Sequence, residues 1–439
     1  MAGVVELYSR WVVLGGVIER VQRQQGVKPR KGIYSCAVVL WLMIWQRLQG
    51  CGTMSHAVRG LRQGVGAGLL VPCKRVREGR ISLTSGAYCQ GVQKMSKLVA
   101  QQVTEELVRR LSEELGDPWP GLPGPVYVVD GSTLQLPYTH KLAEAYRPAP
   151  NQHGESHWPI LRLLVLHDLN SGMALYPQWG AVFGATASSE QKLAAAALAQ
   201  VPAGATILAD RNFGVFSMAW EAHRRGLGVV VRLTKERAYK LHGGPLSQAG
   251  QSAVEWKPSR HDRPQAAAWP QDAAVQGRLI AARVGTGKSQ EWLYLFTTLN
   301  LEAEQIVALY GRRWNIETDL RALKRTVHLQ QLRARSEDGI EKELLAAVCA
   351  YNLVRAVICL AARRAGIEPR RLSFTQVLDL VNMAWPRIMQ APSQEQRDRE
   401  FERLLDWAAE YRLPQRRKER HYPREVWGNG AKFPAKKTT

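Results

Sequence analysis

The sequence predicts a mixed α/β protein in which an α/β core lies between a helical N-terminal unit and a helical C-terminal region. Apolar residues recur at helical spacing through residues 1 to about 115. From residue 126 onward, short apolar runs alternate with helical segments, and after residue 339 the helical spacing returns. A chain of 439 residues is long enough to bury a sizeable core and to form more than one structural unit.

The charge balance points to a polyanionic partner. The chain has 60 lysines and arginines against 38 aspartates and glutamates, which gives a net charge of +22 and a pI near 10.0. Such an excess favours nucleic acid, bound largely through the release of counterions. A membrane surface is the alternative polyanion, but the longest apolar run, residues 36–45, is too short to span a bilayer.

A cytoplasmic location is expected. Charged residues, among them Glu6, Arg10 and Glu19, interrupt the apolar stretch that a signal peptide would need near the N-terminus. The six cysteines are scattered, without a CxxC pair and without clustering with histidine. This pattern predicts neither a disulfide framework nor a zinc site.

The first unit, residues 1–120, is predicted to be entirely helical. Its helices are expected at residues 4–25, 32–48, 54–63 and 83–115. Basic clusters at residues 28–31 and 74–77 fall in the joints between these helices. Two interpretations stay open, a domain that binds DNA ends through its basic joints and a helical packing unit with solvated loops. No residue here can be assigned to a base edge.

A linker rich in Gly and Pro, residues 116–125, marks the boundary to the second unit, residues 121–339. Strands are expected at residues 126–129, 160–167, 173–179, 205–209 and 227–233, and helices at residues 188–198 and 215–225. The second and third strands should form a hairpin, and Ser188 should cap the first helix. Three strands, a helix, then strand–helix–strand is the order of a ribonuclease-H-like α/β domain.

Two acids directly follow predicted strands of this unit. Asp130 and Asp210 stand at strand ends, where sites are usually built in α/β sheets. Taken singly, Asp130 with Gly131 suits a hairpin turn and Asp210 suits a helix N-cap. Together with a third carboxylate, Glu317, they suit two Mg²⁺ ions, because Mg²⁺ prefers oxygen ligands. Two such ions activate a water or a 3′-hydroxyl for in-line displacement at phosphorus.

The third carboxylate lies in residues 309–332, which are predicted to form one continuous helix. At about 100° per residue, one narrow face of that helix carries Tyr310, Arg313, Glu317 and Lys324, with Arg321 and Trp314 beside it. A row of cations around a single acid suits a phosphate backbone with a metal ion in its midst. The alternative is an exposed helix with ion pairs such as Glu317 with Arg321.

The last region, residues 340–439, is predicted to be helical with a basic tail. A long, largely buried helix is expected at residues 340–364, and a second at residues 372–385, stopped by Pro386. The tail from residue 412 mixes Lys and Arg with Tyr422, Trp427 and Phe433. That mixture suits contact with a DNA strand, and a disordered solvated end is the alternative.

Three motifs together resemble one known family. They are VYVVDGSTLQLP, ATILADRNF and the spacing Tyr310-(2)-Arg313-(3)-Glu317-(6)-Lys324. In these motifs the chain resembles the DDE transposases of the Insertion Sequence Four family, including that family's Tyr-Arg-Glu-Lys pattern. The resemblance is most specific over residues 126–355 and continues into the tail. Asn212 is a departure, since relatives usually carry a smaller residue there.

The resemblance implies a cut-and-paste bacterial transposase with a ribonuclease-H-like core. Its implied catalytic and metal-binding residues are Asp130, Asp210 and Glu317, with Mg²⁺ as cofactor and Mn²⁺ as a substitute. Its implied phosphate contacts are Tyr310, Arg313 and Lys324. The implied partners are double-stranded DNA, as terminal inverted repeats and as target, and a second copy of the chain on that DNA. In relatives the freed 3′-hydroxyl makes hairpin ends before target joining. An inactive or domesticated DNA-binding copy is the alternative function.

The family also carries a β-rich insertion, for which residues 234–300 have room. Residues 234–289 fit no simple helix, and strands are expected at 278–284 and 291–299. The intervening GTGKS resembles the end of a P-loop, but Ala282 stands where that motif needs Gly and a strand follows instead of a helix. The segment is therefore predicted to be a hairpin turn, and no ATP is implied.

Two tryptophans are candidates for contact with DNA bases. Trp292 begins the last of those strands, and in relatives a tryptophan at a similar place stacks on a base flipped out of the DNA end. Such stacking returns roughly 1–3 kcal/mol against the cost of extruding the base. Packing in the core is the alternative for Trp292, and Trp314 has the same two interpretations.

Overall fold

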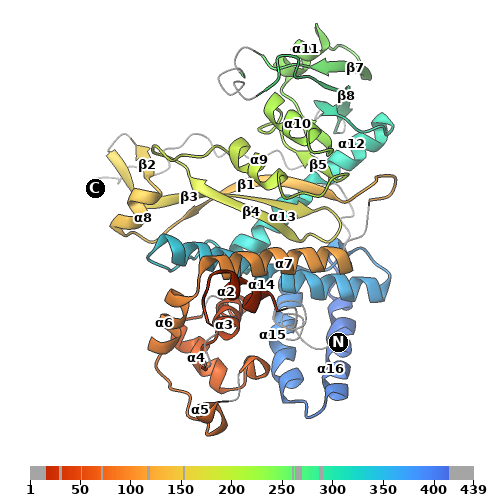
Figure 1. The fold of residues 1–439 in the computed structure, drawn as a ribbon. Coiled ribbons are helices and arrows are strands. Elements are labelled where there is room, and N and C mark those ends of the chain that lie inside the picture. The colour runs from red at the N-terminus through yellow and green to blue at the C-terminus, as the bar shows by residue number, and fades with distance from the viewer. Residues whose placement is uncertain are drawn as a thin grey trace, which may run out of the picture.

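The computed structural model describes residues 16–28, 32–50, 52–70, 73–115, 119–151, 154–259, 262, 269–285 and 290–414. Over these residues the protein is mixed α/β and is built around one sheet of nine strands (Figure 1). Two long helices, α7 (Lys97–Leu115) and α14 (Glu337–Ala365), pack together beneath the hairpin of β3 and β4. The other N-terminal helices and the last two helices lie on the far side of this pair from the sheet.

The N-terminal part is helical, as predicted. Its further α-helices are α2 (Val17–Gln24), α3 (Cys36–Leu48), α4 (Met54–Arg62), α5 (Lys74–Arg77) and α6 (Gly86–Lys94). The single helix predicted at 83–115 is wrong, because Met95 and Ser96 separate α6 from α7. The basic residues 74–77, expected in a joint, form the short helix α5. The start of the predicted helix 4–25 and the cluster 29–31 lie outside the described residues.

The strands of the sheet are β1 (Val126–Gln135), β2 (Pro148–Asn151), β3 (Gly154–Asp168), β4 (Ala174–Ala181), β5 (Thr206–Ala209), β6 (Gly228–Arg232), β7 (Gly250–Trp256), β8 (Val275–Val284) and β9 (Glu291–Thr297). Their order is β2-β3-β1-β5-β6-β9-β8-β7, and β4 pairs with β3. Strands β1, β5 and β6 are parallel to one another, and the other pairs are antiparallel. The predicted hairpin and the predicted strands at 205–209 and 227–233 are confirmed.

Strand β1 differs from its prediction in length. It was expected to end before Asp130, yet it continues to Gln135, and Gly131 pairs with Leu164 of β3. The interpretation of Asp130-Gly131 as a hairpin turn is therefore wrong. The long partner β3 supplies a continuous ladder across this dipeptide, so pairing between strands outweighs the local turn preference of Asp-Gly.

Helices lie between strands of the sheet. They are α8 (His140–Ala145), α9 (Glu190–Leu198), α10 (Phe216–His223) and α11 (Lys235–His242). Helix α10 connects the parallel strands β5 and β6. The N-cap of α9 is Ser189, which accepts a hydrogen bond from the Lys192 amide, and not Ser188 as predicted. Helix α11 lies in residues 234–289, where no simple helix was expected, so that expectation is wrong for Lys235–His242, which Thr234 caps. Strand β7 follows in the same segment. Strands β8 and β9 pair antiparallel, as predicted, while residues 286–289 between them lie outside the described part.

The C-terminal helices pack around α14, which is buried along most of its length. Among the described residues α14 is the one helix long and apolar enough to cross a bilayer, and its apolar window is entirely buried inside the protein. Helix α15 (Phe374–Gln390) passes through Pro386, so the predicted stop there is wrong. The α15 side chains Trp385 and Ile388 are buried, and Trp385 stacks on Trp41 with ring centroids 5.5 Å apart. This packing offsets the roughly 3 kcal/mol cost of an interior proline.

Helix α16 (Gln394–Glu410), which follows α15, was not predicted. It packs against α14 and α15 with Phe401 and Leu404 buried. The basic and aromatic tail beyond residue 414 lies outside the described residues.

Candidate active site

Asp130 and Asp210 stand side by side where the pairing of two parallel strands ends. The ladder between β1 and β5 runs from Val126↔Thr206 to Val129↔Ala209; Asp130 is the next residue within β1, and Asp210 follows the last residue of β5. The paired segments, VYVV and TILA, are buried, as expected for parallel strands covered on both faces. Because adjacent strands lie about 4.8 Å apart, this register brings two carboxylates together where the buried segments give way to partly exposed residues.

Backbone amides and burial set the charge of this pair. The Gly131 amide donates to Asp130 Oδ1 at 2.8 Å, and the Asn212 amide donates to Asp210 Oδ1 at 2.8 Å. Burial raises the pKa of Asp130 to about 6; the Gly131 amide opposes this rise, the Asp210 charge adds to it, and Arg313 opposes it. Two like charges in a partly dehydrated site repel each other, and a cation between them relieves that repulsion.

The segment with the third acid is not one continuous helix, so that prediction is wrong. Helix α12 (Ala303–Gly311) is followed by a 3₁₀ turn at Arg312–Trp314, helix α13 (Asn315–Arg321) and a π turn at Ala322–Thr326. A 3₁₀ turn has about three residues per turn and a π turn uses i→i+5 bonding, so 100° per residue does not hold through either. The side chains expected on one face are therefore distributed differently. Tyr310 is buried, Arg313 and Lys324 are half-buried, and Glu317, Arg321 and Trp314 are exposed.

Tyr310 and Arg313 lie beside the aspartate pair. The Arg313 guanidinium is 5.8 Å from the centroid of the Tyr310 ring and 5.5 Å from that of Trp314. Burial raises the pKa of Tyr310. The charges of Arg313 and Arg232 lower this pKa, and the charge of Asp210 raises it, so these groups share one electrostatic environment. Within the described part of the chain, Arg313 Nε is a buried donor without a hydrogen-bond acceptor. A phosphate oxygen is an acceptor of the kind that such a donor needs.

Lys324 connects the π turn to strand β1. Its Nζ donates to Ser132 Oγ at 2.8 Å and to the Thr133 carbonyl at 3.3 Å. Burial lowers the pKa of Lys324, and the nearby Arg325 charge lowers it further. Lys324 thus lies two to three residues along β1 from Asp130, on the same side of the sheet as α13, which packs against β1.

Glu317 is placed on α13 but is not gathered with the two aspartates. In the described residues, no three Asp, Glu, His or Cys side chains are close enough together to hold one metal ion. The structure therefore brings Asp130 and Asp210 together and leaves Glu317 on a neighbouring element. The carboxylate oxygens of the aspartate pair are the donors that Mg²⁺ prefers, so the chemistry of the pair fits a divalent cation.

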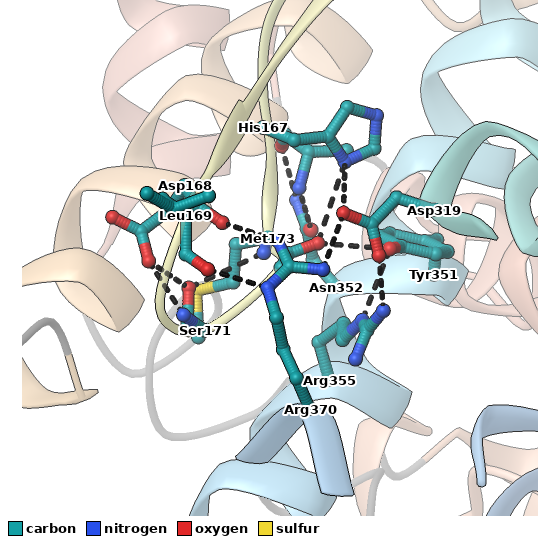
Figure 2. Close-up of polar contacts among 12 residues, drawn as sticks. His167, Asp168, Leu169, Ser171, Met173, Asp319, Tyr351, Asn352, Arg355 and Arg370 are labelled. Carbon is teal, nitrogen blue, oxygen red and sulfur yellow. Dashed lines mark hydrogen bonds and ion pairs between the residues drawn. The ribbon is translucent and has the colours of Figure 1, made fainter. Parts of the chain in front are cut away.

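A buried network of charged groups holds α13 in place (Figure 2). Asp319, on the face of α13 turned about 200° from Glu317, is fully buried. Arg355 Nη2 donates to Asp319 Oδ1 at 2.5 Å, and Arg370 Nη1 donates to Asp319 Oδ2 at 2.8 Å. His167 Nδ1 lies 3.9 Å from Asp319 Oδ2. Burial is the main reason that the pKa of His167 is lowered to about 4, so His167 is neutral near pH 7.

The same network reaches the start of strand β1. Arg370 Nη2 donates to the Asp168 carbonyl at 2.9 Å, and its Nε donates to the Leu169 carbonyl (Figure 2). The Leu169 amide in turn donates to the carbonyl of Val126, the first residue of β1, at 2.8 Å. The helix that carries Glu317 is therefore connected through the β3–β4 turn to the strand that carries Asp130.

The two candidate tryptophans have different surroundings. Trp292 is half-buried, stacks on Tyr294 with ring centroids 6.0 Å apart, and carries the Arg283 guanidinium 4.9 Å from its centroid. Trp314 is 52% exposed, so core packing is the wrong interpretation for this residue. Its exposed indole beside Arg313 offers a ring and a cation together.

Glu190 is a residue of this site that the sequence analysis missed. It is the first residue of α9, and its carboxylate lies next to Gly131 and the Asp130 charge. The capped helix start was recognised, but an acid in a first helical turn is also what the helix dipole favours. Nothing local in the sequence therefore separated Glu190 from an ordinary first-turn acid.

Comparison with known proteins identifies the class of enzyme that this sheet and this pair of acids belong to. Residues 121–353 match the model of the family described as "Transposase DDE domain". The matched range contains Asp130, Asp210, Glu317 and Lys324, and it extends into α14. The protein is therefore a DDE transposase, an enzyme of DNA transposition.

A similar protein is known from Escherichia coli (strain K12), "Transposase InsG for insertion sequence element IS4". The two chains are 26% identical over 353 residues, which span 76% of this chain and 76% of the relative. With the family match, this similarity confirms the expected resemblance: the chain belongs to the IS4 family of DDE transposases.

Proposed function

We propose that this transposase binds the terminal inverted repeats of its own insertion sequence and cuts and joins the DNA there. Asp130, Asp210 and Glu317 are the proposed metal-binding and catalytic residues. The observation that carries this proposal is the register of β1 and β5, which ends at Val129↔Ala209 and so puts Asp130 and Asp210 next to each other. Two neighbouring carboxylates, one of them largely buried, supply the oxygen ligands that a divalent ion prefers and support such an ion there.

The order of the central strands supports a ribonuclease-H-like core. It is β4-β3-β1-β5-β6, with β3 antiparallel to its neighbours and β1, β5 and β6 parallel. We assign residues 121–339 to the catalytic domain, with a β-rich insertion at about 234–300. Residues 1–120 form the proposed DNA-end-binding domain, and residues 340–439 the helical C-terminal region. Strand β9 of the insertion pairs with β6, which continues the core sheet into the insertion.

Mg²⁺, or Mn²⁺ in its place, supplies a Lewis acid that activates the attacking oxygen and stabilises the leaving oxygen at phosphorus. The carboxylates of Asp130 and Asp210 would provide oxygen ligands at fixed positions in β1 and directly after β5. Glu317 would be the third ligand; α13, which carries it, packs against β1, and in the described structure its carboxylate lies outside the cluster of the two aspartates. Arg313, Lys324 and Arg321 neutralise phosphates of the bound end, and Tyr310 supports Arg313 from below.

The proposed reaction is a series of four displacements at phosphorus. A water oxygen forms a bond to phosphorus at the transposon end, the bond from phosphorus to the 3′-oxygen breaks, and that oxygen takes up a proton. The freed 3′-hydroxyl then forms a bond to a phosphorus of the opposite strand, which closes a hairpin end and releases the flanking strand. Hydrolysis reopens the hairpin, and the same 3′-hydroxyl attacks target DNA. Trp292 and Trp314 are the proposed stacking partners of an unpaired base at the end.

The proposed partners are double-stranded DNA and a second copy of the chain bound at the other end, because both ends are cut in one complex. The proposed location is the bacterial cytoplasm, in association with the nucleoid. The net charge of +22 supports a nucleic-acid partner.

The test of the proposed function is Mg²⁺-dependent nicking of DNA that carries the terminal repeats of the element. We expect Glu317→Gln to abolish nicking and to leave end binding nearly unchanged, since the substitution keeps the size of the side chain and removes a metal ligand. Nicking and gel-shift assays on the same preparations measure the two activities.

Asp406→Asn serves as the matched control, because Asp406 is an exposed acid of α16 that pairs with Arg364. This control should nick at the wild-type rate. Equal nicking by wild type and Glu317→Gln would reject the catalytic assignment, whereas end binding without any nicking by the wild type would favour an inactive DNA-binding copy.

A further inference from the structure

A fourth carboxylate lies in the proposed catalytic centre. Glu190 begins α9, whose N-cap Ser189 orients the first turn towards the strand ends. The distance from the position of a Cβ on Gly131 to Glu190 Oε1 is 2.5 Å, so the Glu190 carboxylate lies directly against the residue that follows Asp130. Its charge also contributes to the environment of Asp130. The proposed mechanism gives this residue no role.

Glu190 is connected to Asp210 through Asn212. The side-chain amide of Asn212 donates to Glu190 Oε2, and the backbone amide of Asn212 donates to Asp210 Oδ1 at 2.8 Å. Gln191 Nε2 donates to the Asn212 carbonyl at 2.9 Å. The first two residues of α9 thus hold Asn212 at both its side chain and its backbone, and Asn212 holds one oxygen of Asp210.

The geometry of Gly131 agrees with this arrangement. Any side chain at position 131 would contact the Glu190 carboxylate at distances of 2.5 to 3.1 Å. The position lies inside β1 and pairs with Leu164, so a turn does not explain the glycine. A glycine inside a strand often marks a close approach of another group, and here that group is Glu190.

We propose that Glu190 and Asn212 are positioning residues that fix the orientation of the Asp210 carboxylate. This inference rests on the proposed function of Asp210 as a metal ligand. With Oδ1 held by the Asn212 amide, rotation of the Asp210 carboxylate is restricted. Groups that orient a ligating carboxylate typically change metal affinity or activity 10- to 100-fold when they are removed. Asn212, which departs from the smaller residue usual in relatives, thereby has a physical role.

The test uses the full-length protein with Mg²⁺ and DNA carrying the terminal repeats. The variants are Asn212→Ala, which removes the hydrogen bond to Glu190, and Glu190→Gln, which keeps an acceptor oxygen but removes the charge that strengthens this hydrogen bond. We expect each to raise the Mg²⁺ concentration for half-maximal nicking about 10-fold or more, with end affinity within about twofold of wild type. We expect the Mg²⁺ concentration for half-maximal nicking in the double variant to be no higher than that of the more impaired single variant, because both residues act through one chain of contacts.

Glu236→Gln is the matched control, since Glu236 is likewise a first-turn acid of a helix capped by a hydroxyl residue, Thr234. It should keep the wild-type Mg²⁺ requirement. Gly131→Ala is a second, independent way to displace Glu190, and it should raise the Mg²⁺ requirement in the same direction. Circular dichroism and the melting temperature check that each variant is folded before it is assayed.

An unchanged Mg²⁺ requirement in folded Asn212→Ala and Glu190→Gln would overturn the inference. So would a loss of nicking in Glu190→Gln with wild-type behaviour in Asn212→Ala, because Glu190 would then act directly and not through Asn212. Asp210→Asn distinguishes a failure of the proposed function from a failure of the positioning role. If Asp210→Asn nicks as well as wild type, the proposed function fails; if it does not nick while the other variants match wild type, only the inference fails.

Discussion

Asp130 illustrates how a functional residue can lower the stability of the protein that carries it. Its carboxyl group is largely buried, next to the charges of Asp210 and Glu190, and its pKa is raised to about 6. The folded protein therefore binds the proton more tightly than the unfolded chain, whose aspartates titrate near 3.9. The tighter binding of this proton stabilises the folded protein fully below about pH 4, and that stabilisation is lost as the pH rises through about 6.

Asp130→Asn should consequently stabilise the metal-free protein by about 1–3 kcal/mol at pH 8 and by little at pH 4. The asparagine keeps an oxygen that can accept the Gly131 amide and carries no charge. Urea unfolding in the presence of a chelator at the two pH values measures the difference. The control is Asp379→Asn, an exposed aspartate of α15, which should leave stability unchanged. Equal stability of wild type and Asp130→Asn at pH 8 would contradict the expected cost of the buried charge.

At the residue scale, the sequence predicted the aspartate pair because a strand end is visible in the chain itself. Glu190 could not be found in that way, because its contact with Asn212 joins residues 22 positions apart. Its role depends on how α9 packs against the sheet, which spacing does not encode. Trp314 was ambiguous for the same reason, since only its observed exposure separates a surface ring from a core ring.

At the scale of the element, α13 is a short helix between two irregular turns. Seven residues form few internal hydrogen bonds, so such a helix is marginal on its own and depends on tertiary contacts. The ion network at Asp319 supplies those contacts, from Arg355 on α14 and Arg370 just before α15. The position of Glu317 therefore depends on a buried group on the opposite face of the same helix.

We expect Asp319→Asn to destabilise the protein by about 3–5 kcal/mol, because it leaves two largely buried guanidinium groups without their counter-charge. Thermal and urea unfolding at pH 7 measure this loss. The exposed pair of Arg364 with Asp406 is the comparison, and Asp406→Asn should cost less than about 1 kcal/mol. A loss in Asp319→Asn no larger than that of the surface control would show that the network does not hold α13.

Elements with strong periodic patterns were predicted well, and their junctions were not. Strands β5 and β6 and helix α14 follow directly from apolar runs. The breaks at Met95 and after Gly311, and the continuation of α15 through Pro386, depend on what each segment packs against. Local propensity is a difference of a few tenths of a kcal/mol up to about 3 for proline, and packing of a buried aromatic side chain exceeds it.

At the scale of the whole molecule, the buried core and the net positive charge have different roles. The sheet and α14 form the buried interior, and the excess of 22 positive charges must be carried largely by the remaining surface. Binding to DNA should therefore weaken steeply with salt, with a slope of log K against log salt of about −0.9 per phosphate contact.

Lys324→Ala tests one such phosphate contact. We expect weaker end complexes and a salt slope that is smaller by about 1, because Lys324 lies two to three residues along β1 from the proposed metal site. Arg403→Ala removes an equal charge from α16, where Arg403 pairs with Glu400, and serves as the control. Binding is measured without divalent ions over a series of salt concentrations. The same slope in Lys324→Ala and wild type would speak against a phosphate contact.

The amino-acid sequence was sufficient for the alternation of strands and helices, for the acids at strand ends and for the need of a polyanionic partner. These properties are local or additive, since they depend on neighbouring residues or on the sum of charges. The tertiary structure alone decided that the Glu317 segment is broken into turns, that Asp319 anchors it, and that Glu190 reaches Asp210 through Asn212. Each of these depends on contacts between residues 22 to 51 positions apart, and such pairings are determined only when the elements pack together.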